Sequence, residues 1–473
     1  MVASLPSLKA PGEPSPSDEQ SYFSDPQKFC ATRTGKYGAL FGAGAFDGCT
    51  FVGDAVALAA VGSVAASDDK AFGAPFPRSG EGESFDKYEE AFSEECYACI
   101  FNWIPKYKEA GFSTFRFEDF IDGRVRKMMR SARELVLRSA SLALFGKSYA
   151  QLWQQLGLEN GEELVKLYLA HASSVRGDDT DKGAKKAFAL KLPQLGKKDA
   201  TAALAEALAP WAREQGLSPS EAVEELTWSV EQTAALLCNM LALAQVEPAA
   251  SSQLASEQAA VLKGANPKAT ITSSVLSELP MLDAFQAEVS TCLVGLGRAH
   301  ARFVHLKWEG TERSSESVNP SWRPLLAEVM RLAPPARPFR FQLEQPATLI
   351  EVSLPAGTLV APEPFVEASL SALHKNPDRF DPSRFQSGGE PVSTLCFGGG
   401  CRSQPSPGDL IARDMAKAAF VQLRRMFEEV RLAADPPPIP GGYPLRTLPE
   451  ATEVLFKAKM FYELQRGVKQ LRF

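Results

Sequence analysis

The stretch that decides the fold of this chain is LCFGGGCRSQPSPG, residues 395–408. An aromatic residue, three glycines and an arginine lead to Ser406-Pro407-Gly408, and a long amphipathic pattern follows from Asp409. Glycines carry no Cβ, so such a run lets the backbone approach a flat ligand closely. A helix that starts after the loop would turn its N–H groups and positive dipole end toward a negative ligand atom. The stretch therefore predicts a metal-ligand loop, but one in which the expected ligand is missing.

Three further motifs precede this loop: EVMR at 328–331, PAGT at 355–358 and HKNPDRFDPSRF at 374–385. In order, spacing and content they resemble the C-terminal half of a cytochrome P450. That family has an E-x-x-R helix, a P-x-G-T strand pair, an H-x-x-P…P-x-R-F stretch and an F-x-x-G-x-R-x-C-x-G haem loop. Four ordered motifs over roughly eighty residues are specific where any one alone would not be.

The resemblance implies a mainly α fold with small β-sheets (α+β), built as a single large domain over 21–473 behind a flexible segment at 1–20. It also implies haem b (iron protoporphyrin IX) as the cofactor. The net charge of −6 gives no basic footprint for nucleic acid. No apolar segment reaches the length of a membrane span, and the start lacks the pattern of a secretory signal. We therefore expect a soluble, cytoplasmic protein without a transmembrane anchor, with organelle targeting left open.

The remaining patterns predict elements of this fold. We expect a helix that ends near Gly35, a hairpin with strands at 39–41 and 49–52, a helix from Asp54, and mostly helix over 85–264. Cys96 and Cys99 are interpreted as two thiols on a buried helix face, because one C-x-x-C alone is weak evidence for zinc. Glycines predict helix breaks, and five cations predict a basic stripe on one helix, either solvated or near haem propionates. The breaks are Gly111, Gly146, Gly157, Gly196 and Gly216, and the stripe is Arg124, Arg126, Lys127, Arg130 and Arg133.

A glutamate and an arginine one helical turn apart, Glu328 and Arg331, would project from the same face of a helix. In the family this pair is buried and locked by an arginine of the P-x-R-F stretch, which corresponds here to Arg384. An arginine fork can hold a carboxylate in a bidentate pair. The resemblance thus implies a structural triad that keeps the haem loop in shape. The alternative is a surface ion pair, which would contribute little.

Two positions compete for the place of the proximal cysteine. Counting forward from Arg402 puts Gln404 there, whereas counting back from Gly408 puts Ser406 there and also aligns the helix start GDLIA (408–412) with the family pattern. We therefore expect a two-residue insertion with Ser406 as the metal ligand, and Cys401 as the alternative if the loop is threaded differently. The resemblance further implies cofactor contacts from Phe397, Gly400, Arg402, Ser406, Gly408 and Arg340.

Serine at the ligand position changes the chemistry that iron can do. A thiolate pushes electron density to iron and favours O–O cleavage, whereas a serine hydroxyl is a harder and poorer donor. Ser406 is an engineered replacement of cysteine, a natural hydroxyl or alkoxide ligand, or a sign that haem binds weakly or not at all. We rank the engineered or altered haem site first, and engineered serine-ligated relatives are associated with carbene and nitrene transfer.

The helix expected to cover the iron also departs from the family pattern. Monooxygenases carry A-G-x-[D/E]-T-[T/S], whose acid and alcohol deliver protons to bound oxygen, and residues 228–233 of this chain are WSVEQT. Glu231 matches the acid, Gln232 replaces the alcohol, and Thr233 matches only the final position. These three are the predicted catalytic residues. The loss of the alcohol argues against efficient O₂ activation.

Relatives that need no such proton delivery use a substrate that already contains an O–O bond. We therefore expect a lyase, dehydratase or isomerase that acts on a small hydrophobic substrate, a fatty-acid hydroperoxide of the kind that gives oxylipins. The N-terminal region resembles that hydroperoxide lyase and allene oxide synthase branch in Tyr22-Phe23, Arg33, Lys36-Tyr37 and Phe41. One alternative is an oxidoreductase, a monooxygenase with a redox partner that Arg413 and Lys417 could bind, unless these form a solvated helix face. Another is a non-catalytic helper of P450 fold.

Overall fold

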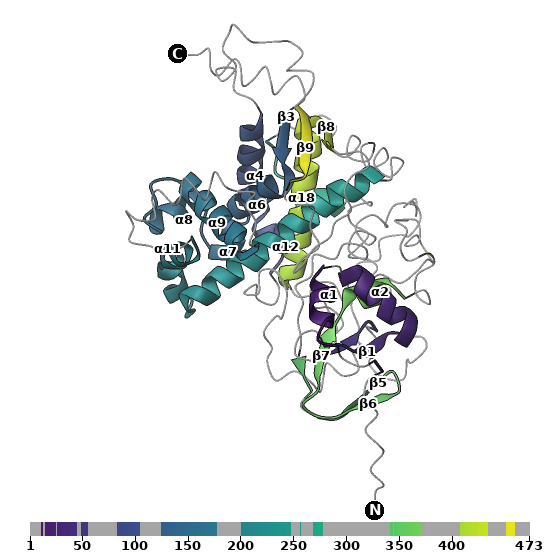
Figure 1. The fold of residues 1–473 in the computed structure, drawn as a ribbon. Helices are drawn as coiled ribbons and strands as arrows, with labels where there is room; N and C mark the ends of the chain where they lie inside the picture. The colour runs from purple at the N-terminus through teal and green to yellow at the C-terminus, as the bar shows by residue number, and fades with distance from the viewer. Residues whose placement is uncertain are drawn as a thin grey trace, which may run out of the picture.

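The structure is a computed structural model. The described residues are 11–12, 15–24, 26–44, 49–54, 83–104, 124–176, 200–246, 256, 268–277, 341–343, 345–370, 376, 407–433 and 451–458. Within these ranges the fold is mainly helical with three small sheets, which confirms the predicted α+β class. Figure 1 shows the long helices gathered in one body, with the N-terminal helices and the largest sheet beside it.

The longest helix described in the helical body is α12 (Pro219–Val246), which contacts α6, α11 and α18. The predicted break at Gly146 is confirmed, because this residue ends α7 with φ 66°, a left-handed conformation that favours glycine. Gly157 and Gly216 follow α8 and α11 in the same way, while Gly111 and Gly196 lie outside the described residues. The other elements of the body are η1 (Phe85–Lys87), α4 (Glu89–Trp103), α6 (Met128–Ser139), α7 (Ser141–Phe145), α8 (Tyr149–Gln155), α9 (Gly161–Arg176), α11 (Ala200–Glu214), α14 (Ser273–Ser277) and α18 (Pro407–Met426).

Helix α18 lies in the interior of this body. From Ile411 to Val421 all its side chains except Asp414 are buried. It contacts α4, α12 and α14 as well as a strand near the C-terminus. A helix enclosed on every side can be apolar all round, and alanines at several positions let its neighbours approach closely. The segment that follows the glycine loop is therefore the central helix of the fold.

A four-stranded sheet joins the N-terminal region of the sequence to residues 341–362. The predicted hairpin is confirmed as β1 (Leu40–Gly42) paired antiparallel with β2 (Thr50–Val52). Strand β2 then pairs in parallel with β7 (Leu359–Pro362), which pairs antiparallel with β4 (Phe341–Gln342). The P-x-G-T motif forms the turn into β7, where the Thr358 hydroxyl donates to the Pro355 carbonyl at 2.7 Å. A separate hairpin, β5 (Ala347–Leu349) and β6 (Val352–Leu354), precedes this turn.

The second sheet contradicts the predicted basic helix. Residues Arg124–Lys127 form strand β3, which pairs with β9 (Glu453–Ala458), and β9 pairs in turn with β8 (Phe427–Leu432). The prediction that the five cations lie on one helix is therefore wrong. The first three lie on a strand, and only Arg130 and Arg133 lie on the following helix, α6. The partner strand is supplied from near the C-terminus, so a local pattern could not reveal it.

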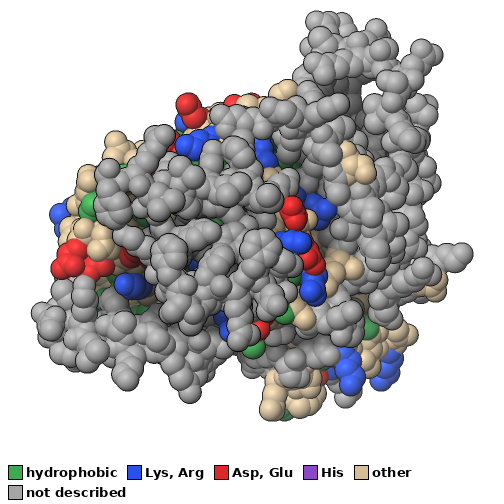
Figure 2. All heavy atoms as spheres, turned by 90° about the horizontal axis from the view of Figure 1, so that it is seen from above, with side chains coloured by type: hydrophobic (Ala, Val, Ile, Leu, Met, Phe, Trp, Pro, Cys, Tyr) green, Lys and Arg blue, Asp and Glu red, His purple; other side chains and the backbone are tan. Residues whose placement is uncertain are grey.

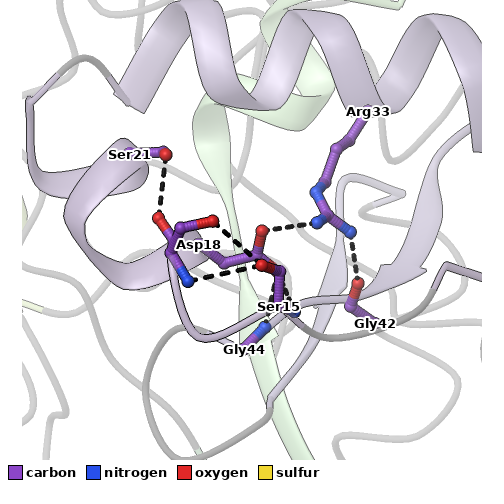
Figure 3. Close-up of polar contacts among 7 residues, drawn as sticks. Ser15, Asp18, Ser21, Arg33, Gly42 and Gly44 are labelled. Atoms are coloured by element: carbon purple, nitrogen blue, oxygen red, sulfur yellow. Dashed lines mark hydrogen bonds and ion pairs between the residues drawn. The ribbon is translucent and has the colours of Figure 1, made fainter.

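The N-terminal segment is held against the first hairpin. Its helices are α1 (Asp18–Ser24) and α2 (Pro26–Tyr37). Figure 3 shows the Asp18 carboxylate accepting hydrogen bonds from the backbone N–H groups of Ser15 (3.0 Å) and Gly44 (2.8 Å) and from Arg33 Nη2 (2.6 Å). Arg33 Nη1 also donates to the Gly42 carbonyl at 3.0 Å. One buried carboxylate thus ties the start of α1 to α2 and to the β1–β2 turn.

Candidate functional site

Most of the predicted ligand loop lies outside the described residues. This holds for the predicted metal ligand and its rival, the structural triad and four of the cofactor contacts, namely Ser406, Cys401, Glu328, Arg331, Arg384, Phe397, Gly400, Arg402 and Arg340. Their roles stay predictions. The described part of the site consists of the start of α18 and the middle of α12, and these two helices contact each other.

Helix α18 begins at Pro407, and Gly408 is buried at its first turn. Proline is favoured at a first helical position, since its fixed φ suits the helix and its missing N–H costs no hydrogen bond. Ser406, counted back from Gly408, therefore immediately precedes the helix in the sequence, as a ligand at the mouth of a helix should. Oxygen from Ser406 and sulfur from Cys401 are both donors that iron accepts, so the donor set is compatible with haem.

The predicted acid, Glu231, is part of a buried cluster on α12. Its Oε1 accepts hydrogen bonds from Arg133 Nε of α6 at 2.7 Å and from the Tyr168 hydroxyl of α9 at 2.8 Å. The Arg133 side chain is 1% exposed and that of Glu231 is 11% exposed. The carboxylate therefore sits in a charged, hydrogen-bonded contact between three helices. Burial of Arg133 also shows that the solvated face predicted for it is wrong.

The two residues after Glu231 are fully buried. The Thr233 hydroxyl donates to the backbone carbonyl of Ser229 at 2.8 Å, one turn earlier in the same helix. Glu231 and Thr233 are about 200° apart around the helix axis, so they face nearly opposite directions. Gln232, between them, carries an amide, which neither gains nor loses a proton near neutral pH. The acid and the alcohol of α12 therefore do not face one another.

A histidine near this cluster was not predicted from the sequence. His171 of α9 is buried, with Nε2 at 3.0 Å from Thr227 Oγ1 of α12 and Nδ1 at 2.9 Å from Thr201 Oγ1 of α11. Its signal in the sequence is only a spacing: Tyr168 and His171 lie one turn apart, as do Thr227 and Glu231. Such a spacing shows which residues share a helix face but not which helix lies opposite.

Both cations considered for a redox partner, Arg413 and Lys417, are buried in α18. The Lys417 ammonium lies 2.8 Å from the Asp414 carboxylate. Burial contradicts both predictions made for these two residues, a docking surface and a solvated face. Figure 2 shows acidic and basic side chains side by side among the described residues on the face that it presents.

The C-x-x-C pair behaves as predicted. Cys96 and Cys99 are buried in α4, and burial raises the pKa of both thiols above the ordinary value. Within the ranges that the structure covers, no group of three or more histidine, cysteine or carboxylate side chains is arranged to hold a metal ion. None of the helices described there has the length and apolar character needed to cross a membrane.

One comparison with known proteins finds a match to a family model. Residues 323–452 match the sequence model of the family described as Cytochrome P450. The match spans all four motifs of the C-terminal half, including the glycine loop. None of the curated proteins matches the chain. The family match supports the P450 superfamily, a haem cofactor and a haem-dependent enzyme.

Proposed function

With the match to the P450 family as the premise, we propose that this protein cleaves the O–O bond of an organic hydroperoxide and rearranges or dehydrates the product. The substrate class is a fatty-acyl hydroperoxide, a small hydrophobic molecule. A bound haem b would supply the one-electron chemistry of O–O cleavage. The proposal depends on one observation: the two side chains of α12 that could carry a proton, Glu231 and Thr233, are already hydrogen-bonded to other groups of the protein.

Activation of O₂ by a monooxygenase requires protons delivered to the bound oxygen, and a hydroperoxide requires none. In α12 the Glu231 carboxylate is held by Arg133 and Tyr168, and the Thr233 hydroxyl is bonded to the Ser229 carbonyl. The residue at the alcohol position, Gln232, is an amide and a poor general acid. These contacts support a reaction in which the substrate itself brings the O–O bond.

The cations of α18 support the same reaction. A monooxygenase receives electrons from a docked partner, and exposed charge of one sign steers such encounters. Arg413 and Lys417 are buried, so neither can form part of that surface. A hydroperoxide already holds the oxidising equivalents that the reaction needs. We therefore propose that no redox partner is required.

Within this proposal, Ser406 is the proximal ligand and Cys401 is its rival. The test starts with purification, followed by addition of haemin and the ferrous–carbonyl spectrum. We expect a coloured protein with the spectrum of an oxygen ligand, and Ser406→Cys should restore the band of a thiolate. Cys401→Ser is the matched control, and it should leave the wild-type spectrum unchanged. Loss of that spectrum in Cys401→Ser would assign the ligand to Cys401 instead.

Turnover is measured by mixing the haem-loaded protein with a fatty-acid hydroperoxide in the absence of any reductase. We expect consumption of the peroxide and carbonyl, epoxide or rearranged products. Product formation only with a reductase and O₂ would instead establish a monooxygenase. A colourless protein that takes up no haemin would exclude both enzymes and favour a non-catalytic helper.

A further inference from the structure

Two polar contacts join α9 to α12 in the protein interior. The Tyr168 hydroxyl donates to Glu231 at 2.8 Å, and His171 meets the Thr227 hydroxyl at 3.0 Å. From α6, Arg133 adds its 2.7 Å contact to the same Glu231 oxygen. We call these five residues the polar seam: Arg133, Tyr168, His171, Thr227 and Glu231.

The spacing of the polar seam matches on both helices. Tyr168 and His171 are three residues apart on α9, and Thr227 and Glu231 are four apart on α12, so each pair lies on one helix face. Rotation of α12 by a single residue, about 100°, would separate both contacts at once. A slide of α12 along its axis would do the same. The polar seam therefore specifies one rotation and one height for α12.

The hydrogen-bond directions at His171 agree with a fixed arrangement. The Thr227 hydroxyl donates to the Val223 carbonyl at 2.6 Å, so its oxygen accepts from His171 Nε2. A neutral ring with its proton on Nε2 would use Nδ1 to accept from the Thr201 hydroxyl of α11, 2.9 Å away. Each polar atom of this part of the seam thus has a defined role, which rigidifies a buried network.

Loss of the contact between Arg133 and Glu231 would be strongly unfavourable, because both groups carry charge and both are buried. Arg133 is almost wholly buried and stays protonated, because a guanidinium does not lose its proton in proteins. A buried cation without its counter-charge is strongly unfavourable. A reaction in which Glu231 gave a proton to substrate would first require it to be neutral, beside a buried cation that favours the carboxylate.

We propose that Glu231 is a positioning residue rather than a proton donor, and that the polar seam fixes α12 so that Gln232 keeps its buried place on the helix. The seam is a property of the folded protein and does not depend on which substrate the enzyme uses. If the hydroperoxide activity proposed above proves wrong, the role of the seam can still be measured.

Thermal unfolding of the full chain is the first test. Glu231→Gln keeps the shape and the acceptor for Tyr168 but removes the counter-charge, and it should lower the Tm by about 5 °C. Arg133→Met in the same background removes the buried cation that has lost its contact with the Glu231 carboxylate, and it should recover at least half of that loss. Lys127→Met, at an exposed ion pair with Glu453, is the control and should leave the Tm unchanged. An unchanged Tm for Glu231→Gln, or no recovery in the double variant, overturns the proposal.

The pH profile of peroxide consumption separates positioning from proton donation. If Glu231 donates a proton, a limb of the wild-type profile disappears in the haem-loaded Glu231→Gln variant. We expect the limbs of both profiles to coincide, with the variant changed in KM more than in kcat. A lost limb would assign Glu231 to the chemistry and refute the inference. If neither protein consumes a hydroperoxide, the proposed function fails while the unfolding measurements still decide the role of the seam.

Discussion

The Tyr22 hydroxyl donates a hydrogen bond of 2.5 Å to the Glu363 carboxylate, and the two residues are 341 positions apart in the sequence. Both side chains are buried. The second oxygen of Glu363 accepts from the backbone N–H of Phe365, at the start of α17 (Pro364–Ala368), at 3.0 Å. The backbone N–H of Glu363 donates to the Val52 carbonyl at 2.9 Å. Glu363 therefore joins α1 and α17 through its carboxylate and the four-stranded sheet through its backbone N–H.

Removal of the Tyr22 hydroxyl should destabilise the protein. Tyr22→Phe removes a hydroxyl that donates to a buried carboxylate oxygen, so we expect the free energy of unfolding to fall by about 1–3 kcal/mol. Urea denaturation measures the change. In a Glu363→Gln background the same substitution should cost less, since the two effects share one hydrogen bond. Equal costs in both backgrounds would show that the contact contributes nothing specific.

The contacts of Asp18 predict the resistance of the N-terminal segment to protease. Asp18→Ala removes the acceptor shared by Ser15, Gly44 and Arg33, so residues 15–24 should open locally and be cleaved several times faster. Asp18→Asn keeps one acceptor oxygen and should have a smaller effect. Limited proteolysis followed by mass spectrometry measures the cleavage. Ser21→Ala, at an exposed hydroxyl, is the control and should not change the rate.

Substitutions at the tip of the β5–β6 hairpin should stabilise the protein, because the backbone there is strained. Ile350 and Glu351 have φ of 47° and 64°, left-handed values that are unfavourable for a β-branched residue. A two-residue turn with two positive φ values favours Asn-Gly. The double substitution Ile350→Asn with Glu351→Gly should relieve about 1–2 kcal/mol of strain and slow hydrogen exchange in the hairpin. Faster exchange in the variant would contradict this expectation.

The buried thiols of α4 predict a loss of stability at alkaline pH. Burial raises the pKa of Cys96 and Cys99 above the ordinary value of 9.0, so the unfolded chain releases these protons at a lower pH than the folded protein. Their contribution is present below pH 9 and falls as the pH rises above it, by up to about 1.4 kcal/mol per pH unit for each thiol.

Urea denaturation between pH 7 and 10.5 measures this effect. Cys96→Ala should lower stability at pH 7, because it leaves a small cavity, but should make the decline above pH 9 shallower. Burial also raises the pKa of Tyr149 from 10.0, so the wild-type curve carries this second decline, and the comparison with the variant isolates the thiol. Parallel curves for the two proteins would be inconsistent with the assigned cause.

The sequence predicts those parts of this fold that depend on local patterns. The hairpin at 39–52 was found because alternating and aromatic residues flank a glycine-rich turn, and helix ends were found at Gly146, Gly157 and Gly216. The strand at Arg124–Lys127 was mistaken for helix because the strand that pairs with it lies near the C-terminus. Pairing partners of this kind carry no local signal.

The candidate site was predictable to a similar extent. Motif spacing identified Glu231, Gln232 and Thr233 on one helix, and all three lie buried in α12. It could not identify Arg133 or Tyr168, because a buried cation resembles a solvated one until the opposite helix is known. The same reason explains why the burial of Arg413 and Lys417 was not predicted. Their spacing is typical of a helix surface, but their helix has no exposed face between Ile411 and Val421.

The enclosed position of α18 has a consequence for how the protein is made. Strand β2 cannot complete its pairing until β7 has been synthesised, and strand β3 cannot pair until β9 has been synthesised. The helices that pack on α18 likewise cannot bury their contacting faces before α18 is present. The ribosome must therefore have synthesised the chain as far as β9 before the core can close, and strand edges stay exposed in the meantime. Early release of a shortened chain would leave the helical body without its centre. Synthesis of β7, α18 and β9, rather than folding of the first helices, determines when the native core can first form.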